Sequence, residues 1–160
     1  MSHMHKEHQY QTSLLWTGNR GQGTVRYTGY ERSFTLHAAG KADIMGSSDP
    51  AFRGDPTRYN PEELLVASLS SCHMLQFLHE CSIAGVSVVE YMDHASGTME
   101  ETAGGGGRMT EVVLHPIVTV ALREMVEKAE ACHEAAHRKC FIANSCNFPV
   151  RHLATCTPLE

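Results

Sequence analysis

The stretch NPEELLVASLSSCHMLQFLHECSIAG, residues 60–85, decides the fold because both of its ends carry the signals of a single long helix. Asn60 is a good N-cap, and Pro61 suits the first helical position. The two glutamates that follow favour the positive end of the helix dipole. Gly85 is typical of the residue that ends a helix. The sequence therefore predicts a helix over residues 61–84.

The predicted helix is apolar around much of its circumference. The side chains that make it so are Leu64, Leu65, Leu69, Cys72, Leu75, Phe77 and Leu78. Such a helix is typical of a central, buried position. We therefore expect its neighbours in the fold to cover more than one of its faces.

Cys72 lies midway along this helix, away from any loop and from any paired-ligand motif. A lone thiol in such a place is either inert core filler or a nucleophile held in an apolar pocket. The choice depends on which other groups reach it. The candidates are Cys140, an arginine near the N-terminus and a glutamate at the start of the helix.

The segments before the helix have the pattern of strands and turns. Residues 12–40 predict a β-meander, in which residues 18–21 form the first turn and residues 24–30 and 33–37 alternate in polarity like strands. Residues 38–59 are rich in Gly, Ser, Asp and Pro, and they predict a long irregular segment.

The segments after the helix predict a hairpin and a second helix. Residues 86–99 and 109–120 are rich in strand-forming residues and flank four glycines at 104–107, which is typical of a long hairpin. A second helix is expected over about residues 122–137. A short turn or helix at 140–145 and a final strand at about 151–155 complete the prediction.

The composition is that of an ordinary soluble domain. The chain has 160 residues, 42% hydrophobic content and a net charge of -5, so its charge gives no reason to expect nucleic acid or an anionic membrane as partner. No apolar run is as long as a membrane span, and the N-terminus has no apolar signal core. These features predict a cytoplasmic protein.

The domain prediction is a single domain over residues 11–160. The His-rich residues 1–10 are expected to be a disordered tail or the remnant of an expression tag. The six cysteines contain no C-x-x-C pair, so a structural zinc knuckle is not expected. In a reducing compartment, catalysis or burial must explain them.

A catalytic thiol needs a neighbouring cation or a helix N-terminus that lowers its pKa. Arg20, in the first turn, is the candidate cation because an arginine is always charged, and Glu62 is the candidate carboxylate that orients it. Glu62 and Cys72 are ten residues apart, about 15 Å along a straight helix. We therefore expect one subunit to supply the thiol and the other to supply Arg20 and Glu62.

Three segments resemble the OsmC/Ohr family, the osmotically inducible protein C and organic hydroperoxide resistance proteins. They are the helix start Asn60-Pro61-Glu62-Glu63-Leu64-Leu65, the segment Ser70-Ser71-Cys72-His73-Met74-Leu75 and the segment His137-Arg138-Lys139-Cys140-Phe141-Ile142-Ala143-Asn144-Ser145. The order of elements agrees from about residue 12 onward. The resemblance implies an α+β, OsmC-like fold of antiparallel sheets with a long buried central helix and a second helix, assembled as an intertwined homodimer.

The same resemblance implies a cysteine-based peroxidase without metal, flavin or other cofactor. Cys72 would be the peroxidatic thiolate, Cys140 the resolving thiol, and Arg20 and Glu62 the activating pair at the subunit interface. An organic hydroperoxide would be reduced to its alcohol, and the Cys72 sulfenic acid would condense with Cys140 to a disulfide. An external dithiol, a lipoyl group in relatives, would then reduce this disulfide.

Two positions depart from the Ohr branch of the family. Phe141 stands where that branch has proline after the second cysteine, and His73 follows Cys72. Both features resemble an OsmC-like branch instead.

Other readings of these residues remain open. The chain is alternatively a non-enzymatic OsmC-like dimer that binds an apolar small molecule or senses redox state. Arg20 is alternatively a solvated turn residue, and Glu62 an acid that stabilises the helix dipole. Cys81, Cys132, Cys146 and Cys156 are expected to be core or surface thiols.

A third reading comes from the segment His133-Glu134-Ala135-Ala136-His137, which matches the H-E-x-x-H pattern of zinc hydrolases. Its two histidines would lie on one helix face, as zinc binding requires. No third ligand follows at a known spacing, so this reading ranks behind the other two.

Overall fold

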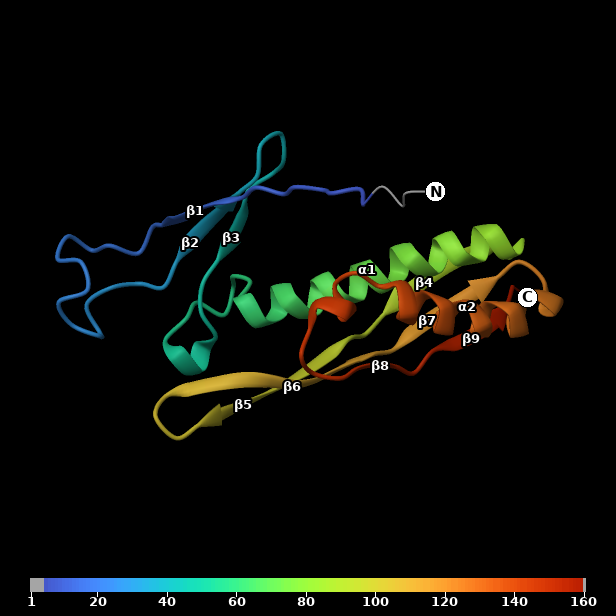
Figure 1. The fold of residues 1–160 in the computed structure, drawn as a ribbon. Coiled ribbons are helices and arrows are strands. Elements are labelled where there is room, and N and C mark those ends of the chain that lie inside the picture. The colour runs from blue at the N-terminus through green and yellow to red at the C-terminus, as the bar shows by residue number, and fades with distance from the viewer. Residues whose placement is uncertain (1–4, 160) are drawn as a thin grey trace. The chain divides into compact units, whose positions relative to one another are not determined.

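The computed structural model describes residues 5–159, so the prediction of a tail at residues 1–4 lies outside the described residues. Residues 5–10 are exposed and form neither helix nor strand. The chain divides into two compact units, Met1–Pro61 and Glu62–Glu160. Figure 1 shows the elements of both units in chain order.

The N-terminal unit is built on a three-stranded antiparallel sheet in the order β1-β2-β3. Its strands are β1 (Ser13–Trp16), β2 (Phe34–His37) and β3 (Ile44–Gly46), and the short 3-10 helix η1 (Pro50–Phe52) follows them. β3 and η1 lie inside the segment that was predicted to be irregular.

The strand predicted at residues 24–30 is wrong, because this segment consists of turns and bends. Contacts from Arg32 explain why this segment turns instead of forming a strand. The Arg32 guanidinium lies over the rings of Tyr27 and Tyr30 at 4.5 and 4.0 Å and donates to the backbone carbonyls of both tyrosines. The loop is closed at its base by the hydrogen bond from the Glu31 amide to the Gly18 carbonyl. A side chain at Gly18 would collide with the Glu31 carbonyl, so this position requires glycine.

The C-terminal unit begins within the first turn of α1 (Pro61–Ala84), and the predicted bounds of this helix are confirmed. Gly85 follows with a φ of 72°, the left-handed conformation that suits glycine after a helix. No helix among residues 5–159 is both long and apolar enough to cross a membrane.

Two mixed sheets lie next to α1, one in the order β4-β7-β9 and the other in the order β5-β6-β8. Their strands are β4 (Val88–Asp93), β5 (Ser96–Thr102), β6 (Gly106–Leu114), β7 (Pro116–Val120), β8 (Val150–His152) and β9 (Thr155–Pro158). The pairs β5–β6 and β4–β7 are antiparallel, which confirms the predicted hairpin with its glycine tip. β8 and β9 instead pair in parallel with β6 and β7.

The single final strand predicted at about residues 151–155 is in fact these two strands, β8 and β9. The chain changes sheets between them, and the Leu153 amide donates to the Leu114 carbonyl where β6 ends. The second helix, α2 (Val126–Lys139), begins later than predicted because the 3-10 turn η2 (Arg123–Met125) precedes it. Another 3-10 turn, η3 (Ala143–Ser145), follows it.

The core of this unit has two parts, both of which contain residues of α1. The first joins α1, α2 and β7 through Phe77, Cys81, Val86, Val118, Val120, Ala129, Cys132 and Ala136. The second joins α1 to β6 and β8 through Leu69, Val112, Leu114 and Val150. α1 therefore spans both sheets (Figure 1).

Within the C-terminal unit, α1 is covered on one face. Its buried residues are Leu69, His73, Phe77 and Cys81, which recur every four positions and so form one stripe. Leu75 is 63% exposed and Ile83 is 69% exposed. The cover that the sequence predicts for a second face is therefore not supplied by the C-terminal unit itself.

Candidate active site

The structure brings Cys72 and Cys140 into contact. Cys72 lies in the middle of α1 and is half-buried, whereas Cys140 is the C-cap residue of α2 and only 1% exposed. The two thiol side chains interact directly, and this interaction contributes to the raised pKa of Cys140. Two thiols in contact need little movement to form a disulfide.

The turn after α2 holds Cys140 in place. The backbone amide of Asn144 donates to the Cys140 carbonyl at 3.0 Å, and its side-chain amide donates to the Arg138 carbonyl at 3.1 Å. These bonds satisfy carbonyls that the end of a helix leaves without partners. The motif around Cys140 therefore positions the thiol through its own local hydrogen bonds.

Cys140 is a neutral thiol near pH 7. Burial raises the pKa of Cys140 to about 11, and its direct interaction with Cys72 acts in the same direction. Backbone hydrogen bonds from the η3 turn lower this pKa but do not offset burial. Since the thiolate is the nucleophilic form, Cys140 is poorly suited to attack an oxidant first. Cys72 is also the more accessible of the two sulfurs.

Arg20 lies in the loop between β1 and β2, where it forms an ion pair with Glu31. The two side chains are exposed, so the pair adds little to stability. The sequence did not indicate this pairing with Glu31, and the role of Glu62 as the carboxylate that orients Arg20 stays a prediction. The register that pairs Trp16 with Phe34 brings these two segments together, and only knowledge of that register would have revealed Glu31.

Glu62 is half-buried in the first turn of α1. Because α1 is continuous from Pro61 to Ala84, Glu62 lies about 15 Å from Cys72 along the helix axis. A single chain therefore does not bring these two side chains together, as the spacing had predicted.

A buried histidine cluster next to Phe77 was missed as a unit by the sequence analysis. His73 Nε2 lies 3.0 Å from His133 Nδ1, and the His133 ring stacks on Phe77 with a centroid separation of 3.9 Å. His152 stacks on His73 at 5.3 Å, and His137 lies 5.2 Å from His152. The cluster joins α1, α2 and β8.

Burial keeps the central pair of histidines neutral. It lowers the pKa of His73 to about 4 and that of His133 to about 3, and neighbouring histidines add to both shifts. His133 Nε2 is buried and has no hydrogen-bond partner among the described residues. These side chains are therefore part of the core near neutral pH.

The H-E-x-x-H segment does not form a metal site in the described part of the chain. Residues 5–159 contain no group of three or more His, Cys, Asp or Glu side chains placed to hold a metal ion. His133 Nδ1 is hydrogen-bonded to His73, and Glu134 forms an ion pair with His152. The zinc-hydrolase reading therefore lacks the ligand set that it requires.

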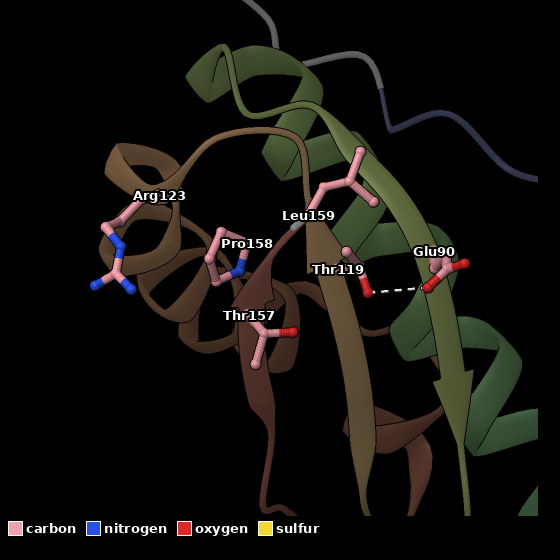
Figure 2. Close-up of a pocket in the computed structure, with 6 residues that line it drawn as sticks. All are labelled: Glu90, Thr119, Arg123, Thr157, Pro158 and Leu159. Carbon is pink, nitrogen blue, oxygen red and sulfur yellow. Dashed lines mark hydrogen bonds between the residues drawn. The ribbon is translucent and has the colours of Figure 1, made fainter.

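A hollow of about 640 Å³ lies elsewhere, at the edge of the β4-β7-β9 sheet. Its lining residues are Glu90, Thr119, Arg123, Thr157, Pro158 and Leu159. The Thr119 hydroxyl donates to Glu90 at 3.0 Å. Figure 2 shows this hydrogen bond as a dashed line, with Arg123 at the opposite end of the hollow. It contains none of the predicted site residues and no thiol, so it does not contribute to the thiol site.

One solved structure that resembles this chain is that of an OsmC-like protein of unknown function from Vibrio cholerae. It is 30% identical to this chain, with a TM-score of 0.82, and the match covers 93% of this chain and 100% of the other. No protein of curated function gives a significant match to the sequence.

Two organic hydroperoxide resistance proteins share the fold at lower identity. The protein from Elizabethkingia anophelis is 19% identical, with a TM-score of 0.67 over 96% of this chain and 100% of the other. The protein from Legionella pneumophila is also 19% identical, with a TM-score of 0.66 over 94% of this chain and 99% of the other.

The family model for OsmC-like proteins matches residues 54–152, which include α1, α2, Cys72 and Cys140. This match confirms the resemblance that the cysteine segments indicated, and the α+β fold agrees with it. The chain belongs to the OsmC-like protein family.

Proposed function

We propose that this protein is a thiol-dependent peroxidase that reduces organic hydroperoxides to alcohols through Cys72 and Cys140. The observation that carries the proposal is the direct interaction of these two thiols, one half-buried and one buried. Membership of the OsmC-like family supports a redox role, and two proteins of the same fold are named organic hydroperoxide resistance proteins.

The reaction starts at the more accessible sulfur. The Cys72 thiolate attacks one peroxide oxygen, the O–O bond breaks, and the alkoxide leaves as the alcohol after taking a proton. Cys72 is left as a sulfenic acid. The Cys140 sulfur then attacks the Cys72 sulfur, water leaves, and a disulfide joins the two residues. An external dithiol, with a lipoyl group as the proposed form, reduces the disulfide by thiol exchange.

The proposed enzyme is a homodimer, and the one-sided cover of α1 supports this arrangement. Leu75 is an exposed apolar residue on a helix whose other face is in the core. A second subunit would remove this apolar surface from water. We further propose that Arg20 of the partner subunit lowers the pKa of the Cys72 thiol and that Glu62 of the partner subunit orients this arginine.

The proposed location of this chemistry is the cytoplasm. An unpaired thiol site of this kind persists in a reducing compartment, where external dithiols are also available. The net charge of -5 gives no support for nucleic acid or an anionic membrane as a partner.

A single-turnover experiment tests the proposal. Reduced protein is mixed with one equivalent of cumene hydroperoxide, and peptide mass spectrometry and chromatography measure the disulfide and the alcohol. We expect stoichiometric alcohol and a Cys72–Cys140 disulfide. C72S should abolish both products, and C140S should stop at the sulfenic acid. C146S is the matched control, because Cys146 is half-buried and its sulfur contacts the Ile142 carbonyl instead of a thiol.

Two outcomes would contradict the proposal. One is alcohol production that survives in C72S. The other is slow, substoichiometric oxidation of the wild type, which would favour a non-enzymatic dimer that binds an apolar molecule or senses redox state. Steady-state assays with dihydrolipoamide or thioredoxin, and with hydrogen peroxide as the alternative oxidant, identify the reductant and the substrate class.

A further inference from the structure

We propose that Cys81 and Cys132 form a second redox dithiol, which excess hydroperoxide converts to a disulfide that crosslinks α1 to α2. This inference goes beyond the proposed peroxidase. It takes the same class of oxidant but uses sulfur atoms that the peroxidase reaction does not involve.

The two side chains are already in contact. Cys81 is the last residue of the buried stripe of α1, and Cys132 lies on the buried face of α2. Their thiols interact directly in the core between these helices and β7. The chain therefore holds two thiol pairs. Cys72 and Cys140 join α1 to the C-cap residue of α2, and Cys81 and Cys132 join α1 to α2 itself.

The two pairs are separate sites. Cys72 and Cys81 are nine residues apart on α1 (81 − 72), which is about 13.5 Å along the helix axis. Cys132 and Cys140 are eight residues apart (140 − 132), in and just after α2. Direct exchange between the pairs would need sulfur atoms in contact. Each pair must therefore be oxidised in its own place.

Of this second pair, Cys132 carries the sulfur that an oxidant reaches first. It is 6% exposed and lines a groove of about 370 Å³ between α1 and α2. The apolar part of this groove is made by Ile83, Ala84, Ala131 and Ala135. Cys81, at 1% exposed, does not line the groove. The groove therefore leads a small apolar hydroperoxide to Cys132 and not to Cys81.

The chemistry balances with one hydroperoxide per disulfide. The Cys132 sulfur attacks a peroxide oxygen, the O–O bond breaks, and the alcohol leaves with a proton, so Cys132 becomes a sulfenic acid. The Cys81 sulfur then attacks the Cys132 sulfur, and water leaves with the Cys81 proton. Two thiols are oxidised and the hydroperoxide is reduced to alcohol and water.

Cys81 suits the role of the thiol that attacks the Cys132 sulfenic acid, and it makes formation of this disulfide slow. Burial and the neighbouring Cys132 raise the pKa of Cys81 far above the ordinary value for a thiol, so it is protonated near neutral pH. Oxidation of this pair should therefore follow oxidation of Cys72 and Cys140 and require more oxidant. Cys156, on β9, lies close to both thiols and is the rival partner for Cys132.

The test uses the full chain with the first pair removed. The variant C72S/C140S is treated with excess cumene hydroperoxide, free thiols are alkylated, and crosslinked peptides are identified by mass spectrometry. We expect a Cys81–Cys132 crosslink that is lost when C81S or C132S is added and retained when C156S is added. Because both cysteines of the peroxidase site are absent, failure of the proposed function would leave this result unchanged.

A second measurement uses the wild-type protein, so that the test does not depend on a core variant that folds poorly. In a titration of wild-type protein with hydroperoxide, the Cys81–Cys132 crosslink should appear after the first disulfide is complete. Circular dichroism confirms that each variant is folded before it is compared. A Cys132–Cys156 crosslink, oxidation of Cys132 without any crosslink, or free Cys81 and Cys132 thiols at full oxidation of the first pair would each overturn the proposal.

Discussion

Cys140 holds its proton firmly, and this sets the pH dependence of the second step of the proposed reaction. Because its pKa is raised to about 11, chiefly by burial, its thiolate fraction grows about tenfold with each pH unit below that value. We expect the Cys72 sulfenic acid to condense with Cys140 about tenfold faster per pH unit from about pH 7 to about pH 10. Rapid-quench alkylation measures this rate. A rate that stays constant over this range would argue against Cys140 as the resolving thiol.

The buried histidine pair makes the fold sensitive to acid. The pKa values, about 4 for His73 and about 3 for His133, lie below the ordinary value of 6.5. As the pH falls through 6.5, the unfolded chain therefore binds these protons before the folded chain does. The contribution of the two neutral histidines to the free energy of unfolding is fully present above this pH. As the pH falls, it should decline by about 1.4 kcal/mol per pH unit for each titrating histidine, down to about pH 4.

Urea unfolding at a series of pH values measures this decline. The variant H73L/H133F removes both buried imidazoles, so its stability should change less steeply between these pH values even if it is less stable at pH 7. The control is H37N, because His37 is exposed and paired with Asp43. An unchanged slope in H73L/H133F would show that other groups cause the sensitivity to acid.

The loop between β1 and β2 owes its shape to one side chain. Arg32 makes two cation–π contacts with Tyr27 and Tyr30, which together are worth about 1–2 kcal/mol. R32A should therefore raise hydrogen exchange of the loop amides about tenfold. Protection in the β2–β3 ladder should stay, and R26A, in the same loop, is the charge-matched control. Equal hydrogen-exchange rates of the loop amides in R32A and R26A would show that Arg32 does not determine the shape of the loop.

The elements differ in how far the sequence could predict them. Both ends of α1 were predicted because Asn60, Pro61 and Gly85 act through local chemistry. The loop over residues 24–30 alternates like a strand, but contacts from Arg32 override this pattern. Contacts such as Arg20 with Glu31, or His73 with His133, depend on strand register and helix packing, which no local pattern encodes.

The proposed site is complete only in a dimer. Cys72 and Cys140 meet within one chain, whereas Glu62 lies about 15 Å along α1 from Cys72. The exposed Leu75 shows that α1 has an apolar face left for a second subunit. If the partner's Arg20 activates Cys72, two differently inactivated chains should restore each other.

Mixing C72S with R20A tests this exchange of residues between subunits. Each homodimer should be inactive, because one lacks the attacking sulfur and the other lacks the cation. In a hybrid dimer, the R20A chain keeps its thiols and the C72S chain supplies Arg20, so one of the two sites is complete. Since half of randomly mixed dimers are hybrids, the mixture should recover about a quarter of the wild-type activity. Mixing R20A with the double variant C72S/R20A is the control, because no hybrid then contains Arg20. If the first mixture stays inactive although mass spectrometry detects hybrid dimers, Arg20 does not act across the interface.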